Sequence, residues 1–267
     1  MTKPANRQRP TFEVAEVEVS GLAGRIHWTA GTPATGSGDE PAYVLIHGIG
    51  VSHRYLSRLH AVLAAHAPTY SFDLPGFAGT AKPDRQLQVE DYGAFIAEAL
   101  ASRGIDRYVL VGHSMGVQFA IEAALHAPER VQRLVLMGPV VDSRHKSILR
   151  QSLALALDGV LRESPSSNWI VISDYFRCGL RWYLTELPVM MGYPTEKRLA
   201  GIKVPVLVLR GSRDQVAGPD WSLRLSRTVG QGRLVEIPGV GHVAQHMRPQ
   251  AVADAIRSFV AATTQRS

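Results

Sequence analysis

Short, wholly apolar segments alternate with amphipathic helical segments along most of this chain. The apolar segments include YVLIHG from residue 43, YVLVGHS from residue 108 and VPVLVLRG from residue 204. Between the first two lies the stretch 52–66, in which Tyr55, Leu56, Leu59, Val62 and Leu63 recur at helical spacing. Strands that are apolar on both faces predict a parallel sheet covered by helices on both sides.

The remaining segments extend the same alternation. Residues 12–20 alternate apolar and polar side chains, and RIHWT follows after a glycine-containing turn, which predicts an antiparallel hairpin. Further strands are expected at TYSFDLPG from residue 69, RLVLMGPV from residue 133 and RLVEIP from residue 233. Helices are expected at 88–104, at 115–128, near 220–229 and from Pro249 to Val260.

The alternation stops between residues 142 and 200. No strand followed by a helix is recognisable there, and the composition favours helices. We therefore expect one domain, with a core formed by 1–141 and 201–267 and a helical insertion at 142–200. The insertion carries several aromatic residues, namely Trp169, Tyr175, Phe176, Trp182, Tyr183 and Tyr193.

Composition, charge and cysteine content indicate which partners and which cellular compartment to expect. The 267 residues are 45% hydrophobic with a formal charge of +6, yet the basic residues are scattered among acids, so no nucleic-acid partner is expected. The basic start is not followed by the apolar region of a secretory signal, and no run approaches the ~18 apolar residues of a membrane span. A single cysteine, Cys178, excludes an internal disulfide and is expected to pack in the interior. These features predict a cytoplasmic protein.

Gly112-His113-Ser114-Met115-Gly116 matches the pattern G-x-S-x-G directly after an expected strand and directly before an expected helix. A serine on so sharp a turn requires small residues two positions before and after it, and both are glycine. The following helix N-terminus favours the negative charge that develops in acyl transfer. Ser114 is therefore a candidate nucleophile, whereas the alternative is an ordinary glycine-flanked turn.

A serine nucleophile requires a base and an orienting acid later in the chain. Asp214 follows the strand VPVLVLR, although an aspartate in Gly-Ser-Arg-Asp is also good turn chemistry. His242 lies beyond the last expected strand, directly after Gly239 and Gly241, which allow the loop to fold back over the strand ends. One ring nitrogen of His242 would face Ser114 and the other Asp214. His246 is a competitor that falls closer to the final helix.

The sequence His47-Gly48-Ile49-Gly50 follows another expected strand. Glycines there would let a backbone amide approach a reacting carbonyl, so the amides of Ile49 and Met115 are candidates for an oxyanion hole. The third glycine of G-x-G-x-x-G is missing, and neither H-E-x-x-H nor a Cys/His cluster occurs. No metal or organic cofactor is expected.

Together these motifs resemble the α/β-hydrolase superfamily: HGIG after its third strand, DLPGFAGT after the fourth, GHSMG after the fifth, GSRDQV after the seventh and GVGH after the eighth. The resemblance implies an eight-stranded, mostly parallel, twisted sheet flanked by helices, with 142–200 as a helical cap. It makes Ser114 nucleophile, Asp214 acid and His242 base. In some relatives the acid follows the sixth strand, which would select Asp142. Two departures are an extra residue in DLPGFAGT and Val117 in place of a further glycine.

The predicted reaction is hydrolysis of a small or medium apolar ester through an acyl-enzyme. Two alternatives remain at this stage. The same three residues could hydrolyse a C–C bond of a diketone-like compound, or the fold could bind a small molecule without turnover. The oligomeric state is left open by the sequence.

Overall fold

The computed structural model describes residues 11–29, 41–142, 144 and 165–264. Its centre is an eight-stranded sheet in the order β1-β2-β4-β3-β5-β6-β7-β8. The hairpin β1–β2 and the pair β2–β4 are antiparallel, and every other neighbouring pair is parallel. The strands are β1 (Phe12–Val19), β2 (Leu22–Thr29), β3 (Ala42–Ile46), β4 (Thr69–Asp73), β5 (Tyr108–His113), β6 (Val131–Met137), β7 (Val206–Gly211) and β8 (Gly232–Ile237).

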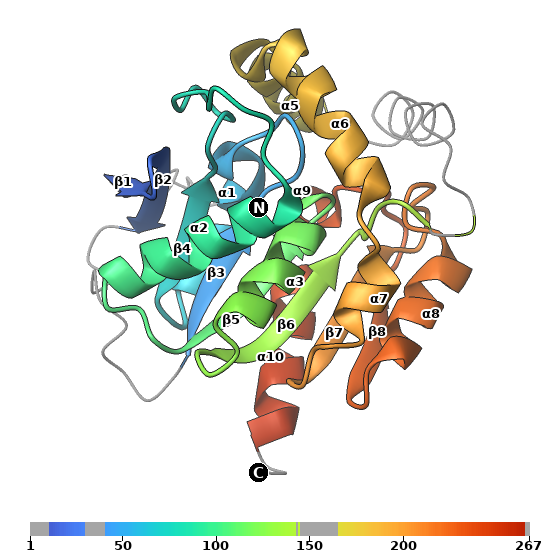
Figure 1. The fold of residues 1–267 in the computed structure, drawn as a ribbon. Helices are drawn as coiled ribbons and strands as arrows, with labels where there is room; N and C mark the ends of the chain where they lie inside the picture. Colours follow the sequence, from blue (N-terminus) through green and yellow to red (C-terminus); the bar gives the residue numbers. More distant parts are fainter. Residues whose placement is uncertain (1–10, 30–40, 143, 145–164, 265–267) are drawn as a thin grey trace, which may run out of the picture.

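Helices cover both faces of this sheet (Figure 1). Helices α1, α9 and α10 contact one another on one face, whereas α2, α3, α7 and α8 follow one another across the other face. The helices of the described residues are α1 (His53–Ala64), α2 (Val89–Ser102), α3 (Gly116–His126), α5 (Pro165–Cys178), α6 (Leu180–Gly192), α7 (Thr195–Leu199), α8 (Pro219–Thr228), α9 (Ala244–Met247) and α10 (Pro249–Thr264).

Alternate residues of the central strands enter two different hydrophobic clusters. Val44 and Leu110 pack with α2 and α3, whereas Leu45 and Val111 pack with α1 and α10. All four are fully buried. A strand buried on both faces must be apolar at every position, which explains the uninterrupted apolar runs of the sequence.

The register brings the carboxyl ends of the parallel strands to one edge of the sheet. Ile46 of β3 pairs with Gly112 of β5, and His113 of β5 pairs with Met137 of β6. On the other side, Gly211 of β7 pairs with Ile237 of β8. The loops that follow these strands therefore start side by side, where ligand crevices form in sheets of this kind.

The expected fold class is confirmed, with differences at element ends. β2 begins at Leu22, earlier than expected, and α10 continues to Thr264 instead of ending at Val260. The short helices α7 and α9 were not predicted individually. Within the expected insertion the structure shows α5, α6 and α7, and residues 143 and 145–164 lie outside the described part. In that part, no helix is both long and apolar enough to cross a bilayer.

Candidate active site

Ser114 occupies the sharp turn between β5 and α3. Its φ angle is 58°, in the left-handed region that non-glycine residues rarely adopt, and its amide donates to the carbonyl of Met137 over 3.0 Å. A Cβ added at Gly112 would lie 2.3 Å from the carbonyl oxygen of Gly116. One added at Gly116 would lie 2.5 Å from the carbonyl oxygen of Ile46. The two glycines of the motif are thus required by backbone crowding.

Asp214 and His242 meet at the ends of β7 and β8. Oδ2 of Asp214 lies 3.0 Å from Nδ1 of His242. Oδ1 accepts hydrogen bonds from the amides of Val216 at 2.8 Å and Ala217 at 2.9 Å. The carboxylate is fully buried and held on both oxygens, so it can fix the orientation of the imidazole.

Asp214 is favoured in its charged form. Burial by itself acts to raise the pKa of this carboxyl, because a charge is poorly solvated in the interior. The charge and hydrogen bond of His242, with the two amide donors, act in the opposite direction and leave the pKa of Asp214 below its ordinary value. An ionised Asp214 in turn favours a proton on His242 when that ring accepts one.

The loop that carries His242 lies against the turn that carries Ser114. The carbonyl oxygen of His242 is 3.0 Å from Nε2 of His113, the residue before the serine. Gly138, which follows β6, approaches the His242 ring closely: a Cβ added at Gly138 would lie 3.0 Å from Cε1 of His242. The structure therefore brings Ser114, Asp214 and His242 to the same sheet edge, as the sequence predicts.

The loop after β3 forms another wall beside the serine. A Cβ added at Gly48 would lie 2.9 Å from Cβ and 3.3 Å from Oγ of Ser114. The buried ring of His47 accepts from the amide of Leu74 at 3.1 Å and is 2.7 Å from the carbonyl oxygen of Gly48, to which Nδ1 donates. The carbonyl of Gly48 and the N–H of Ile49 belong to the same planar peptide unit. A hydrogen bond that holds this carbonyl therefore also fixes the direction of the Ile49 N–H. Sequence reasoning missed this role of His47.

The two competing residues have other partners. Asp142 forms an ion pair with Arg224 of α8, and its Oδ1 accepts from the amide of Arg144 at 3.0 Å. His246 lies in α9, where burial and the nearby Arg58 lower its pKa to about 4. Asp214 is the acid that contacts His242.

Helices α5 and α6 lie close to the loop after β3. A Cβ added at Gly50 would lie 2.6 Å from Cε1 of Tyr175 and 3.0 Å from Cδ2 of Tyr183. Asp174 of α5 is fully buried and accepts from Ser52 Oγ at 2.5 Å and from Arg54 at 3.0 Å. These contacts tie α5 to the start of α1, next to the candidate site (Figure 1).

One cluster of metal-ligand residue types occurs among the described residues. Nε2 of His27 and Nδ1 of His53 lie 2.8 Å and 2.9 Å from Oδ2 of Asp73. The two rings are stacked, with centroids 3.6 Å apart and planes inclined by 19°. Ligands around tetrahedral zinc approach from widely diverging directions, whereas these nitrogens point side by side at one carboxylate. The geometry therefore fits a hydrogen-bonded cluster.

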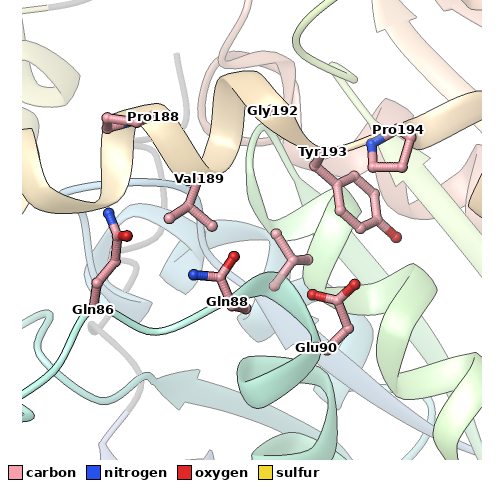
Figure 2. A pocket seen from close by; sticks show the side chains of 9 residues that line it. Gln86, Gln88, Glu90, Pro188, Val189, Gly192, Tyr193 and Pro194 are labelled. Carbon is pink, nitrogen blue, oxygen red and sulfur yellow. The ribbon is translucent and has the colours of Figure 1, made fainter.

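A pocket of about 320 Å³ lies where the end of α6 meets the start of α2 (Figure 2). Polar side chains from the α2 side face apolar ones from α6 and the segment that follows it. None of its lining residues is one of the predicted site residues, so it is separate from the candidate active site. The lining residues are Gln86, Gln88, Val89, Glu90, Pro188, Val189, Gly192, Tyr193 and Pro194.

The mixed sheet, with a serine turn after β5 and an Asp–His pair after β7 and β8, defines the α/β-hydrolase class. Residues 43–255 match the Alpha/beta hydrolase family, and the chain belongs to that family. Carboxylesterase YbfK of Bacillus subtilis (strain 168) is 24% identical over 246 residues, which cover 85% of this chain and 82% of the relative. The 2-hydroxy-6-oxo-2,4-heptadienoate hydrolase of Pseudomonas putida is 28% identical over 251 residues, which cover 82% of this chain and 88% of the relative.

Solved structures agree with this fold. The enol-lactonase from Burkholderia xenovorans LB400 superposes with a TM-score of 0.76 at 18% identity, covering 92% of this chain and 100% of the other. The carboxylesterase CesB (YbfK) from Bacillus subtilis has a TM-score of 0.74 at 20% identity, covering 94% of this chain and 92% of the other. At such identities the similarity establishes the architecture.

Proposed function

We propose that this chain is a serine hydrolase that cleaves carboxylic esters of small or medium apolar compounds. The observation that carries the proposal is the buried Asp214–His242 pair at 3.0 Å, placed at the same sheet edge as Ser114 in its left-handed turn. An acid, an imidazole and a hydroxyl in that order are the parts needed for acyl transfer.

In the proposed reaction His242 accepts the proton of Ser114 while the serine oxygen attacks the ester carbonyl. The resulting imidazolium is stabilised by the ionised Asp214. His242 then protonates the alkoxide leaving group, and the acyl group remains on Ser114. A water molecule, deprotonated by the same imidazole, attacks the acyl-enzyme. The bond to the serine oxygen then breaks, the imidazolium returns its proton to Ser114, and the carboxylic acid is released.

The negative oxygen of the tetrahedral intermediate is assigned to the amides of Ile49 and Met115. The contacts of His47 with Leu74 and Gly48 support this assignment, because they fix the peptide that carries the Ile49 amide before substrate arrives. A donor held in place in advance costs no reorganisation during the reaction, and each is typically worth ~2.7–4 kcal/mol.

Helices α5 and α6 are proposed to form a cap over this site, within the segment 142–200. The contacts of Tyr175 and Tyr183 with Gly50 support that role, since they place aromatic rings beside the proposed oxyanion loop. Trp182 is similarly close to Gly76, where an added Cβ would lie 2.3 Å from its ring. Aromatic walls suit an apolar acyl or aryl group. Similarity to proteins named carboxylesterases favours an ester.

The proposal is tested with a fluorophosphonate probe and an ester panel of graded acyl length. We expect a single adduct on Ser114, mapped by peptide mass spectrometry, and turnover of short to medium esters. The Ser114→Ala variant is the control for labelling elsewhere. Folded wild-type protein without an adduct on Ser114 would refute the proposal.

Hydrolysis of a C–C bond is the second candidate, because the 28% identical Pseudomonas putida relative is named 2-hydroxy-6-oxo-2,4-heptadienoate hydrolase. Such a reaction can use the same three residues. Parallel assays with a vinylogous diketone and with esters separate the two candidates. Turnover of the diketone alone would replace the ester assignment while leaving the residue roles unchanged.

A further inference from the structure

We infer that His113 and Tyr55 are positioning residues for the proposed general base His242, acting through its main chain. Neither residue belongs to the Ser–His–Asp set, and the inference rests on the function proposed above. Tyr55 comes from α1, His113 from the end of β5 and His242 from the loop after β8. Two consecutive hydrogen bonds thus connect α1, the end of β5 and the loop after β8 beside the candidate active site.

The geometry fixes the direction of each hydrogen bond. Nε2 of His113 lies 3.0 Å from the carbonyl oxygen of His242, which can only accept. Nε2 must therefore carry the ring proton, and Nδ1 has the free electron pair. The hydroxyl of Tyr55 lies 2.8 Å from Nδ1 and 3.2 Å from Nε2 of the same ring. Because Nε2 directs its proton to the His242 carbonyl, Nδ1 is the nitrogen that accepts from the hydroxyl. A hydroxyl that donates to Nδ1 favours the tautomer of His113 that donates to the His242 carbonyl.

Tyr55, His113 and His242 are deeply buried, so the loss of either hydrogen bond would be costly. Tyr55 is 4% exposed, His113 is 0% and His242 is 5%. Water cannot readily replace a lost donor at such depth. Without the His113 donor, the unpaired carbonyl of His242 would favour another conformation of the loop after β8. The imidazole of His242 is attached to the same residue, and its placement against Ser114 would change with the loop.

The His113 ring is also suited to sit beside a base that becomes charged. The rings of His113 and His242 have centroids 4.8 Å apart. Burial, with a smaller effect of His242, lowers the pKa of His113 to about 3, so the ring is neutral at ordinary pH. A neutral donor can hold the loop without repelling the imidazolium that forms on His242 during catalysis.

The first test compares His113→Leu with His113→Gln. Leucine removes the donor with similar bulk, whereas the amide nitrogen of glutamine can reach the position of Nε2. We expect kcat and the rate of fluorophosphonate acylation of Ser114 to fall about 10-fold in the leucine variant, with KM changed less than about 2-fold. Glutamine should restore both rates to within about 3-fold of wild type. A role in folding alone would not separate kcat from KM in this way.

The second test uses Tyr55→Phe and its matched control Tyr108→Phe. Tyr108 is a buried tyrosine at the other end of β5, and its hydroxyl has no hydrogen-bond partner among the described residues. We expect Tyr55→Phe to slow acylation about 3- to 10-fold, because His113 loses the contact that selects its tautomer. Tyr108→Phe should react at the wild-type rate. Circular dichroism and thermal unfolding establish that each variant is folded.

The outcomes separate this inference from the proposed function. Labelling of wild-type Ser114 with slow His113→Leu and Tyr55→Phe variants supports both. Labelling at equal rates in wild type and in a folded His113→Leu variant overturns the positioning role and leaves the proposed function standing. If the leucine variant does not fold, an unchanged rate in Tyr55→Phe overturns it. Absence of labelling in the wild type overturns both.

Discussion

Nδ1 of His242 and Oδ2 of Asp214 are 3.0 Å apart, and the other oxygen of Asp214 is held by two backbone amides. The carboxylate therefore has no freedom to turn away from the imidazole. With Nδ1 engaged, Nε2 is the nitrogen that would exchange a proton with Ser114. This fixed geometry makes the roles of the individual residues testable by substitutions that preserve shape.

Asp214→Asn should keep the fold and lose most of the activity. The amide no longer favours the required tautomer or the imidazolium of His242, and we expect kcat to fall about 10⁴-fold. The measurement is steady-state ester hydrolysis, with thermal unfolding to establish that the variant is folded. Asp142→Asn serves as the matched comparison and should lie within about 3-fold of wild type. The reverse pattern would assign the acid to Asp142.

Ser114→Ala and His242→Ala should each lose nearly as much rate as the double variant, on the order of 10⁶-fold. In the proposed reaction the hydroxyl and the imidazole share one proton transfer, so removing either would abolish the same step. The rates are best measured with an activated ester at high enzyme concentration. Losses that add in free energy would show that the two side chains act independently.

Gly48→Ala should impair the reaction at Ser114 more than it impairs the fold. The new methyl group would lie 2.9 Å from Cβ and 3.3 Å from Oγ of Ser114, so the serine or the loop must move. Displacements of this size can cost about 100-fold in rate. Gly192→Ala is the matched control, because an added Cβ there has open space around it. Equal rates in the two variants would contradict the close approach.

Glu186→Gln should change how stability depends on pH. The carboxyl of Glu186 in α6 is fully buried and accepts from the amide of Leu87 at 3.4 Å, and burial raises its pKa from 4.5 to about 7. The folded protein binds this proton more tightly than the unfolded chain does. The free energy of unfolding should therefore fall as pH rises from about 4.5 through about 7.

The glutamine variant lacks this titration and should exceed the wild type in free energy of unfolding by about 3 kcal/mol at pH 8. The difference should shrink to near zero at pH 4. Urea unfolding at both pH values measures it, and Glu90→Gln, at an exposed position of α2, is the control. A constant difference at both pH values would show that Glu186 does not hold its proton in the folded state.

The strands of the sheet were predictable because burial on both faces demands apolar residues at every position, as in β3 and β5. The candidate site was predictable because its residues follow strand ends directly and stand in short motifs. The crowding around Gly112 and Gly116 also agrees with the steric argument from the sequence.

Other features left no readable pattern. The hydrogen bond of His47 joins residues 27 apart in the chain, and that of His113 joins residues 129 apart. Contacts at such separation depend on the assembled sheet and not on local spacing. Helices α7 and α9 span five and four residues, which is too short for a hydrophobic period to emerge.

The direct pairing of β6 with β7 has a consequence for how this family diversifies. The chain leaves the sheet after Met137 and returns at Val206, yet these two strands are hydrogen-bonded neighbours, with Leu134 opposite Val206. Whatever lies between them can lengthen, shorten or be exchanged while every strand keeps its partner, since loop length costs little free energy. The excursion can thus be replaced while Ser114, Asp214 and His242 keep the strand ends beside which they lie.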